Sequence, residues 1–403
     1  MEVFYRILKS ALKYKASDIH LKVGSPPIVR VDGRLYPFKD FTPLKMEDLQ
    51  EMSALMMGEM QTKHFQEFHE VDLGYGVPGI GRFRVNVYQQ RSSLVIAMRI
   101  ISFDILGFES LNLPPIVEKL IDEQRRGLIL VTGTTGSGKS TTLAAMIDYI
   151  NHHRSENIIT IEDPIEFLHR DNLSVINQRE VGLDTTSFAA ALRAALRQDP
   201  DVLLVGEMRD LETIEIALAA AETGHMVLST LHTVDALETV NRIVSAFPPY
   251  QQPQVRLQLA SILRGVISQR LIERHDQKGR VPAIEVMINN SIVHECICDA
   301  DKTIEIKDAI AKGFTIYGMQ SFDQSILSLY RNGLISYEDA LKETSNPDDF
   351  LLKIQGVSSS SDTSWDAFDK AEADTDAEGD AIIDQENVTA VENDEMEIER
   401  FAK

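Results

Sequence analysis

Length, composition and charge exclude several classes of protein. The chain has 403 residues, of which 43% are hydrophobic, and a formal net charge of −22 at pH 7. This length predicts two or three domains with globular cores. No apolar run reaches the ~18 residues of a membrane-spanning helix, and the amphipathic first segment lacks the apolar core of a signal peptide. We therefore expect a cytoplasmic protein without direct membrane insertion.

The negative charge is concentrated at the C-terminal end. Residues 356–403 hold 15 acidic and 3 basic side chains, a net charge of −12, which leaves −10 for the preceding residues. This tail has few large apolar side chains and is predicted to be disordered on its own. The acidic body argues against nucleic acid as a partner, because neutralising phosphates takes clustered lysine and arginine.

Residues 1–100 have the pattern of a small α+β domain. We expect a helix over 3–12, strands at 18–21, 27–31, 83–88 and 94–100, and a helical stretch over about 46–70. A tight turn is expected at Asp32-Gly33. Residues 101–126 are predicted to form a linker that ends in a helix beginning at Pro114-Pro115.

From residue 127, apolar strands alternate with helices, which is the pattern of a doubly wound parallel sheet. The strands are expected at 127–132, 158–162, 201–206 and 226–230. This α/β core is predicted to cover 127–250. Residues 251–355 are predicted to form a helical C-terminal region, with the longest helical pattern at 254–273.

The most specific motif is an octapeptide at 133–140. It fits G-x-x-x-x-G-K-[ST] at every fixed position, follows an apolar strand and precedes a helix, as a phosphate-binding loop requires. In such loops the backbone and the helix N-terminus bind phosphates, the lysine reaches the β- and γ-phosphates, and the hydroxyl, here that of Ser140, binds Mg²⁺. The residues expected to bind ATP are Gly133, Thr134, Thr135, Gly136, Ser137, Gly138, Lys139, Ser140 and Thr141.

Two further strands end in carboxylates that would face the same crevice. One ends in Glu162-Asp163, and the other in Gly206-Glu207, the arrangement of a Walker B strand. Glu162 and Glu207 are both candidates to activate the attacking water. Asp163 and Glu207 are candidates to hold Mg²⁺ through water, and a solvated acidic turn is the alternative for Asp163. The residues alone do not choose between the two glutamates as the base.

Histidine and arginine side chains complete the candidate site. His225 and His232 bracket the strand at 226–230, and His232 is a candidate to sense the γ-phosphate, although core packing explains such a pair equally well. Arg82 and Arg84 lie on one face of a strand by its two-residue period. They are either ordinary exposed arginines or a finger that meets nucleotide charge, in cis or in trans.

Taken together, these motifs resemble the ATPase superfamily of type II secretion and type IV pili, and most closely its pilus retraction branch. The likeness runs from about residue 2 to residue 350. Besides the phosphate-binding loop, the resemblance is carried by an N-terminal signature, an Asp box, a Walker B region, a His box and a C-terminal motif, at 18–33, 161–166, 199–210, 221–233 and 318–325.

The resemblance implies a PAS-like N-terminal domain and a RecA-like ATPase domain in a homohexameric ring, with nucleotide between the two domains. It implies that Arg84 and Arg99 approach the phosphates. It further implies that Mg²⁺-dependent ATP hydrolysis and domain rotation power pilus retraction and twitching motility. The implied partners are an inner-membrane pilus platform protein, which would hold the ATPase peripherally at that membrane, and other pilus ATPases.

Three departures from the retraction branch limit what the resemblance implies. Thr134 stands where these proteins commonly have proline, which the loop should tolerate, and the acidic tail is an addition. The segment 291–298 replaces a signature tied to retraction. An accessory retraction ATPase is therefore one alternative. An extension or secretion ATPase is another, although the sequence lacks the tetracysteine zinc motif typical of that branch. A RecA-fold motor acting on nucleic acid is disfavoured by the charge.

Overall fold

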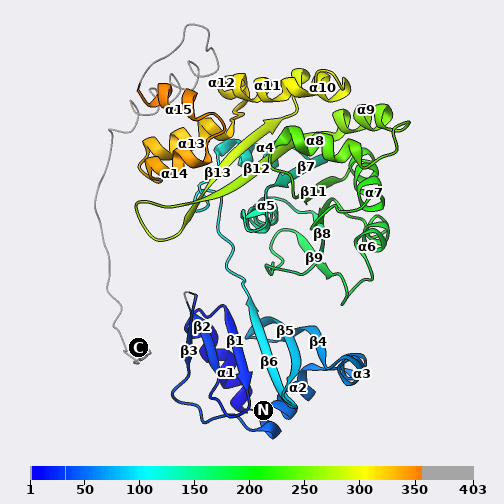
Figure 1. Cartoon of the computed structure of the whole chain (residues 1–403). Coiled ribbons are helices and arrows are strands. Elements are labelled where there is room, and N and C mark those ends of the chain that lie inside the picture. Colours follow the sequence, from blue (N-terminus) through cyan, green and yellow to red (C-terminus); the bar gives the residue numbers. More distant parts are fainter. Residues whose placement is uncertain (1, 32, 356–403) are drawn as a thin grey trace. The chain divides into compact units, whose positions relative to one another are not determined.

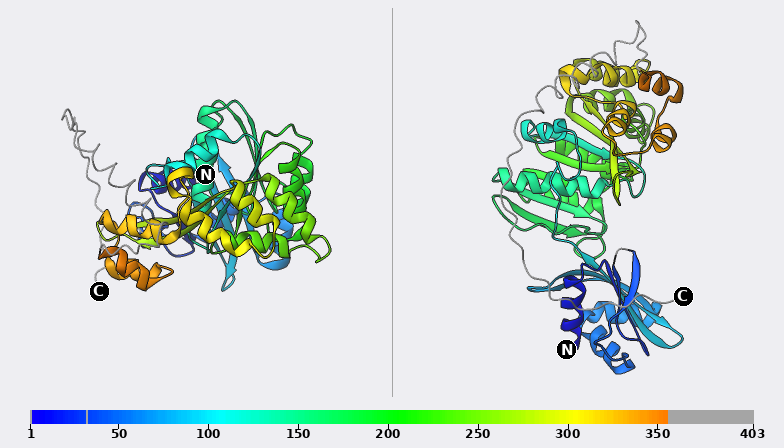
Figure 2. Two further views of the ribbon diagram at one scale, coloured as in Figure 1. Left: turned by 90° about the horizontal axis from the view of Figure 1, so that it is seen from above. Right: turned by 90° about the vertical axis from the view of Figure 1, so that its left-hand side faces the viewer.

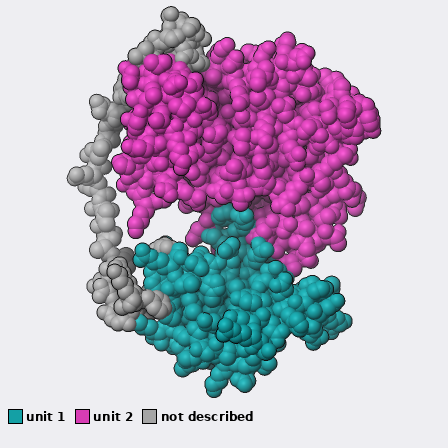
Figure 3. All heavy atoms as spheres, in the orientation of Figure 1, with its two compact units in different colours: residues 1–103, 166–168, 384–403 teal, residues 104–165, 169–383 magenta. Residues whose placement is uncertain are grey.

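The computed structural model describes residues 2–31 and 33–355, so the turn predicted at Asp32 and the disorder predicted for 356–403 lie outside the described residues. The described chain forms two compact units (Figure 3). The first comprises the residues up to 103 together with 166–168. The second comprises 104–165 and continues from 169. Each unit is built on a sheet of its own.

The first unit is a six-stranded antiparallel sheet in the order β3-β2-β1-β6-β5-β4, packed against helices. Its elements are α1 (Glu2–Lys13), β1 (Asp18–Lys22), β2 (Ile28–Val31), β3 (Arg34–Pro37), α2 (Met46–Met56), α3 (Glu59–Phe68), β4 (Glu70–Val77), β5 (Gly81–Gln90) and β6 (Ser93–Ile101) (Figure 1). The predicted first helix and strands are confirmed. The helical stretch expected over 46–70 is two helices, because the chain is extended at Met57 and Gly58 caps the second.

The second unit is a seven-stranded sheet in the order β13-β12-β7-β11-β10-β8-β9, parallel except for the edge strand β13. Its first elements are α4 (Pro115–Glu123), β7 (Gly127–Thr132), α5 (Lys139–His153), β8 (Asn157–Glu162), β9 (Val175–Glu180), α6 (Phe188–Ala195), β10 (Val202–Val205), α7 (Leu211–Glu222), β11 (Met226–Leu231), α8 (Ala236–Ser245) and α9 (Gln252–Ile262). Helices α4 and α5 cover one face and α6 to α9 the other (Figure 2). The four predicted parallel strands are confirmed.

The helix expected over 254–273 is wrong beyond Ile262. Residues 263–288 instead form β12 (Leu263–Glu273) and β13 (Arg280–Ile288), which extend the core sheet. β12 is largely buried, and such a run of apolar residues fits a helix or a strand equally well by period. Gly265 allows β12 to pack closely on α4, since a Cβ there would lie 2.7 Å from the Leu120 side chain.

The C-terminal region beyond these strands is helical, as predicted. Its elements are α10 (Ser291–Cys298), the short 3-10 helix η1 (Thr303–Glu305), α11 (Ile306–Lys312), α12 (Phe314–Tyr317), α13 (Phe322–Arg331), α14 (Tyr337–Glu343) and α15 (Pro347–Ile354). Phe322, Ile326 and Phe350 of this region form a core with Ile272 and Val281 of the β12–β13 pair. Within residues 2–31 and 33–355, no helix combines the length and apolarity needed to cross a membrane.

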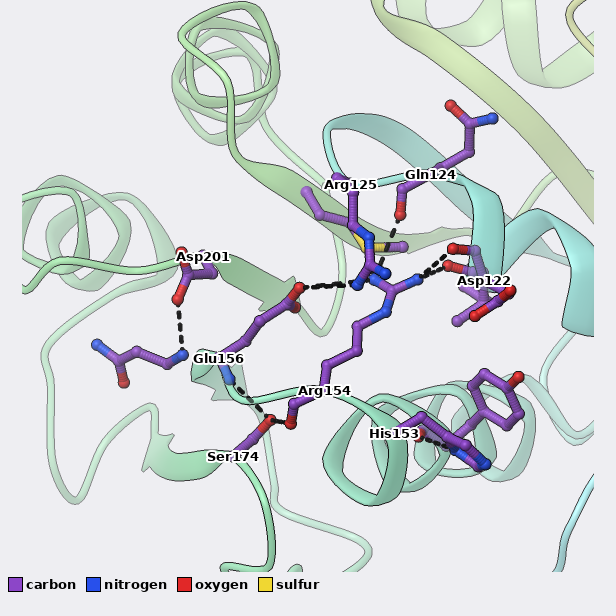
Figure 4. Close-up of polar contacts among 12 residues, drawn as sticks. Asp122, Gln124, Arg125, His153, Arg154, Glu156, Ser174 and Asp201 are labelled. Atoms are coloured by element: carbon purple, nitrogen blue, oxygen red, sulfur yellow. Dashed lines mark hydrogen bonds and ion pairs between the residues drawn. The ribbon is translucent and has the colours of Figure 1, made fainter.

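The end of α5 that lies away from the phosphate-binding loop is fixed by the buried side chain of Arg154 (Figure 4). Its guanidinium donates to the carbonyl oxygens of Ile121, Asp122 and Gln124, the last two at 3.0 and 3.3 Å. These are the final carbonyls of α4, where a cation is favourable. Glu156 lies 3.8 Å from the same guanidinium and balances its charge. Arg154 therefore connects the C-terminal end of α4 to the C-terminal end of α5.

Candidate functional site

The carboxyl ends of four neighbouring parallel strands meet at one edge of the second sheet. The register pairs Thr132 at the end of β7 with Leu231 at the end of β11, and Val205 at the end of β10 with Ile161 of β8. Ligands of open α/β sheets bind at this edge. The predicted site residues that follow or end these strands are Lys139, His232, Glu207 and Glu162.

The phosphate-binding loop has a backbone that favours glycine at three positions. Gly133, Gly136 and Gly138 have φ values of 143°, 81° and 93°. A Cβ on Gly133 would lie 2.4 Å from the carbonyl oxygen of Gln269, so β12 closes the loop from one side. Gly138 is the N-cap of α5, whose first N–H groups have no partner inside the helix. Loop and helix together form an anion-binding cradle.

The Lys139 side chain is buried at this cradle. Its ammonium donates to the carbonyl oxygens of Gly133 at 2.8 Å and Thr134 at 3.0 Å, and lies 3.5 Å from Nδ1 of His232. The charge is therefore held between the loop and the end of β11. A phosphate in the cradle would be within the reach of this lysine, as in other phosphate-binding loops.

Glu207 is held by one cation and one imidazole. Its Oε2 lies 2.7 Å from Nε of Arg209, and its Oε1 lies 3.1 Å from Nε2 of His232. Burial acts to raise the pKa of Glu207, but the hydrogen bond from Arg209 and the interaction with His232 outweigh it and lower the pKa. Glu207 is therefore ionised at neutral pH, as a group that orders a magnesium-bound water must be.

Glu162 is oriented by neutral donors instead. Its Oε1 accepts hydrogen bonds from Oγ1 of Thr160 at 2.6 Å and from Nε2 of Gln178, on β9, at 3.2 Å. Asp163 is exposed, and its charge, after the hydrogen bond and charge of Glu207, raises the pKa of Arg209. Glu162, Asp163 and Glu207 thus belong to one cluster, as the sequence predicted from their strand ends.

Two pockets of the second unit adjoin the cradle. One, of about 430 Å³, is lined by the loop together with Gln269, Arg270 and Arg280. The other, of about 460 Å³, lies beside the start of α5 and has apolar walls that include Leu106 and Leu113. A polar and a partly apolar pocket on either side of the loop suit the phosphates and the base of a nucleotide.

The predicted arginines lie in the first unit, in a row across its sheet. The strand registers align Arg30, Asp18, Arg99 and Arg84. Nε of Arg99 donates to Oδ1 of Asp18 at 3.0 Å, and Arg30 lies 3.6 Å from the other oxygen. Burial acts to raise the pKa of Asp18, but hydrogen bonds from Ser17 and Arg99 lower it on balance. The row keeps an excess of positive charge, with Arg84 exposed beside Arg99.

Sequence reasoning missed Gln269, which lies within the segment predicted as helix. Its Nε2 donates to Oγ1 of Thr142 on α5 at 2.9 Å, and it lines both pockets. The available signal was the polar pair Ser268-Gln269 inside an apolar run, which is costly in a buried strand unless its groups are hydrogen-bonded.

Two buried polar atoms beside the cradle have no hydrogen-bond partner within the described chain. They are Oγ of Ser137, which can donate to an anion, and Oε1 of Gln269, which can only accept. Such groups are expected to bind a ligand or water. No cluster of three or more histidine, cysteine or acidic side chains forms a metal cage in the part that the structure describes. Mg²⁺ needs none, since one or two protein oxygens and the phosphates suffice.

A RecA-like sheet with a complete phosphate-binding loop and acidic strand ends defines a P-loop ATPase. The family model of the type II/IV secretion system protein matches residues 82–359. The type IV pilus retraction ATPase PilT of Pseudomonas aeruginosa is 45% identical over 85% of this chain and 98% of its own length. The type IV pilus ATPase PilU of the same organism is 41% identical over 87% of this chain and 91% of its own.

The likeness extends to three dimensions. A crystal structure of the pilus retraction motor PilT with bound ADP has a TM-score of 0.78 and 48% sequence identity, and covers 85% of this chain and 97% of the PilT chain. The chain therefore belongs to the type II/IV secretion ATPase family and is an ATP hydrolase.

Proposed function

We propose that this ATPase is a motor that powers retraction of a type IV pilus. The observation that carries the proposal is the match to PilT over nearly the whole of both chains, combined with a full set of hydrolytic residues at one sheet edge. The resemblance to retraction motors implies work on a pilus platform of the inner membrane. We therefore place this chain in the cytoplasm, bound to a platform protein of that membrane.

In the proposed site, the loop residues bind the nucleotide and Lys139 meets the β- and γ-phosphates. Mg²⁺ would neutralise phosphate charge, held by the hydroxyl of Ser140 and, through water, by Asp163 and Glu207. Glu162 or Glu207 takes the proton of the attacking water, and His232 reports the γ-phosphate to its neighbours. The hydrogen bonds of Glu162 and the ion pairs of Glu207 support these roles.

Arg84 and Arg99 of the first unit are proposed to act on the same nucleotide. Arg84 and Arg99 sit side by side on neighbouring strands and carry more charge than Asp18 can balance. Such a pair suits the charge that develops on a transferred phosphoryl group. We propose a homohexamer in which closing of the two units around nucleotide is coupled to hydrolysis and drives rotation of the ring's domains.

An accessory retraction ATPase is the second candidate. The match to PilU supports it, as does α10, which occupies the segment that departs from the retraction signature. Deleting the gene and measuring pilus retraction separates the two. If this chain is the principal motor, the deletion strain should not retract its pili, and expression of the Lys139→Ala variant should not restore retraction. An accessory ATPase is dispensable for retraction while a second retraction ATPase is present, and does not support retraction alone.

A further inference from the structure

A buried carboxylate beside the site has no part in the roles given above. Glu285 lies on β13 and is 6% exposed. Its Oε1 accepts a hydrogen bond from the backbone N–H of Ala236, the first residue of α8, at 2.8 Å. A carboxylate at a helix N-terminus is favourably placed, because the first N–H groups of a helix lack internal partners.

The same oxygen is connected to the phosphate-binding loop. Oγ of Ser268, on β12, donates to Oε1 of Glu285 at 3.4 Å, and Oγ1 of Thr132 donates to Oγ of Ser268 at 3.0 Å. Thr132 is the last residue of β7 and precedes Gly133 of the loop. All three side chains are buried. A continuous chain of hydrogen bonds therefore runs from the base of the loop to the start of α8.

The loop that contains His232 leads directly into the N-terminus of α8. Oγ1 of Thr239, in the first turn of α8, donates to the carbonyl oxygen of Asp235 at 2.7 Å, and its hydroxyl lies 2.6 Å from that of Thr233. Thr233, the residue after His232, and Asp235 are thus hydrogen-bonded to α8. A displacement of α8 would move His232 relative to both Lys139 and Glu207.

We propose that Glu285 is a positioning residue that sets His232 against Lys139 and Glu207 by anchoring the N-terminus of α8 to the strand that bears the phosphate-binding loop. The proposal rests on the proposed role of His232 in hydrolysis. Glu285 acts through an acceptor oxygen, so a side chain of the same size that keeps an acceptor should serve, and an apolar one should not.

The test compares purified variants by steady-state ATP hydrolysis. Glu285→Leu should lower kcat by at least about tenfold and leave KM for ATP within about twofold, because positioning of a γ-phosphate contact is lost and nucleotide binding is kept. Glu285→Gln should stay within about threefold of wild type. Thermal unfolding and size-exclusion chromatography establish that each variant is folded and assembled.

Ser325→Ala is the matched control. Oγ of Ser325 accepts from the backbone N–H of Ile284, the residue before Glu285 on β13, at 3.0 Å. This change removes the buried acceptor of a β13 N–H, but Ser325 lies on α13 and its bond leads away from α8, so kcat should stay within about twofold of wild type. Equal losses in Glu285→Leu and Ser325→Ala would overturn the proposal, as would a Glu285→Gln variant as slow as Glu285→Leu.

A double-mutant cycle tests the route through His232. If Glu285 acts through His232, Glu285→Leu should have no further effect on kcat in a His232→Ala background, whereas an unrelated role gives additive losses. If Glu285→Leu does not fold, Ser268→Ala takes its place. It should lower kcat by about threefold in the wild type and leave the His232→Ala variant unchanged, and an equal loss in both backgrounds would contradict the proposal.

Failure of this inference can be told from failure of the site assignment. Lys139→Ala is assayed alongside. Hydrolysis by Lys139→Ala at the wild-type rate would overturn the assignment of the site itself. An inactive Lys139→Ala variant together with a fully active Glu285→Leu variant would overturn only the role of Glu285.

Discussion

Nε2 of His232 lies 3.1 Å from Oε1 of Glu207, while Nδ1 of the same ring lies 3.5 Å from the ammonium of Lys139. An ammonium can only donate, so Nδ1 accepts, and Nε2 carries the proton that is donated to the carboxylate. A neutral imidazole of this tautomer satisfies both neighbours. One ring thus connects the lysine of the phosphate-binding loop to the carboxylate that follows β10.

Removing the charge of Glu207 should slow hydrolysis without preventing nucleotide binding. Glu207→Gln is expected to lower kcat at least roughly a hundredfold, the scale of losing a base or a water-orienting group. Glu162→Gln should also be slow if its carboxylate positions the water. Rapid-quench hydrolysis and fluorescent-nucleotide binding measure the two steps separately. Normal turnover in both variants would refute the assignment of these carboxylates.

The pH dependence of an Arg209 variant identifies the base. Arg209 lowers the pKa of Glu207, so removing it should raise that pKa, since burial is then opposed by His232 alone among the two partners. If ionised Glu207 limits turnover, Arg209→Gln should move the acidic limb of the pH–kcat profile to higher pH. An unmoved limb in a variant of otherwise normal activity assigns the limiting ionisation to another group, with Glu162 the next candidate.

Replacing Arg84 should impair catalysis without affecting folding. Arg84→Ala is expected to lower ATP turnover at least about tenfold, the scale of losing phosphate-charge stabilisation, and to leave the melting temperature unchanged, because Arg84 is exposed. Arg30→Ala removes a cation from the same row and the same Asp18, and serves as the control with turnover near wild type. Equal activity of the Arg84 and Arg30 variants would argue against a nucleotide contact by Arg84.

Glu285 should make stability depend on pH. Burial first, and then the charge of Asp235, raise the pKa of Glu285 to about 7, against the lowering effects of the Ala236 N–H, Lys307 and Arg270. The folded chain therefore holds this proton between pH 4.5 and 7 while the unfolded chain has lost it. The stabilisation is complete below pH 4.5 and is lost as pH rises through 7.

This dependence is measured against Glu285→Gln, which cannot titrate. Urea unfolding at fixed protein concentration should show the wild type losing up to about 3 kcal/mol relative to the variant as pH rises from 5 to 8. Parallel pH profiles for the two proteins would show that Glu285 does not titrate in this range.

Arg154 should be needed for the stability of the second unit. Arg154→Met keeps the aliphatic stem but leaves buried carbonyls of α4 without their donor, and leaves Glu156 with Arg125 as its remaining cation. The free energy of unfolding is expected to fall by about 3 kcal/mol. Arg125→Met is the control, because that guanidinium is 60% exposed beside the same Glu156, and its loss should cost less than about 1 kcal/mol. Similar losses for the two variants would contradict this account of Arg154.

Sequence reasoning could group the candidate site residues because they follow strands. Carboxyl ends of adjacent parallel strands share an edge, so Lys139, Glu162, Glu207 and His232 could be grouped before the structure was known. The role of the loop glycines could also be predicted, since a positive φ and close contacts restrict which residues can replace them. The row of Arg84 and Arg99 follows from their pairing across a hairpin.

The β12–β13 pair could not be derived in the same way. A buried strand does not alternate polar and apolar residues, so its apolar run is equally compatible with a helix. For this reason Gln269 and Glu285, which lie on these strands, were not predicted as site residues. The structural role of Arg154 likewise cannot be predicted from the sequence, because its partners are backbone carbonyls 30 to 33 residues away. The role of a buried polar group can be assigned only when the fold shows which groups it contacts.

The most direct test of the account is ATP hydrolysis by purified Lys139→Ala next to the wild type, both checked for folding and assembly. Lys139 joins the loop carbonyls to His232 and is the only lysine of the phosphate-binding motif. We predict magnesium-dependent turnover by the wild type and none above background for the variant. Hydrolysis by Lys139→Ala at the wild-type rate would show that the chemistry occurs elsewhere and would contradict the account.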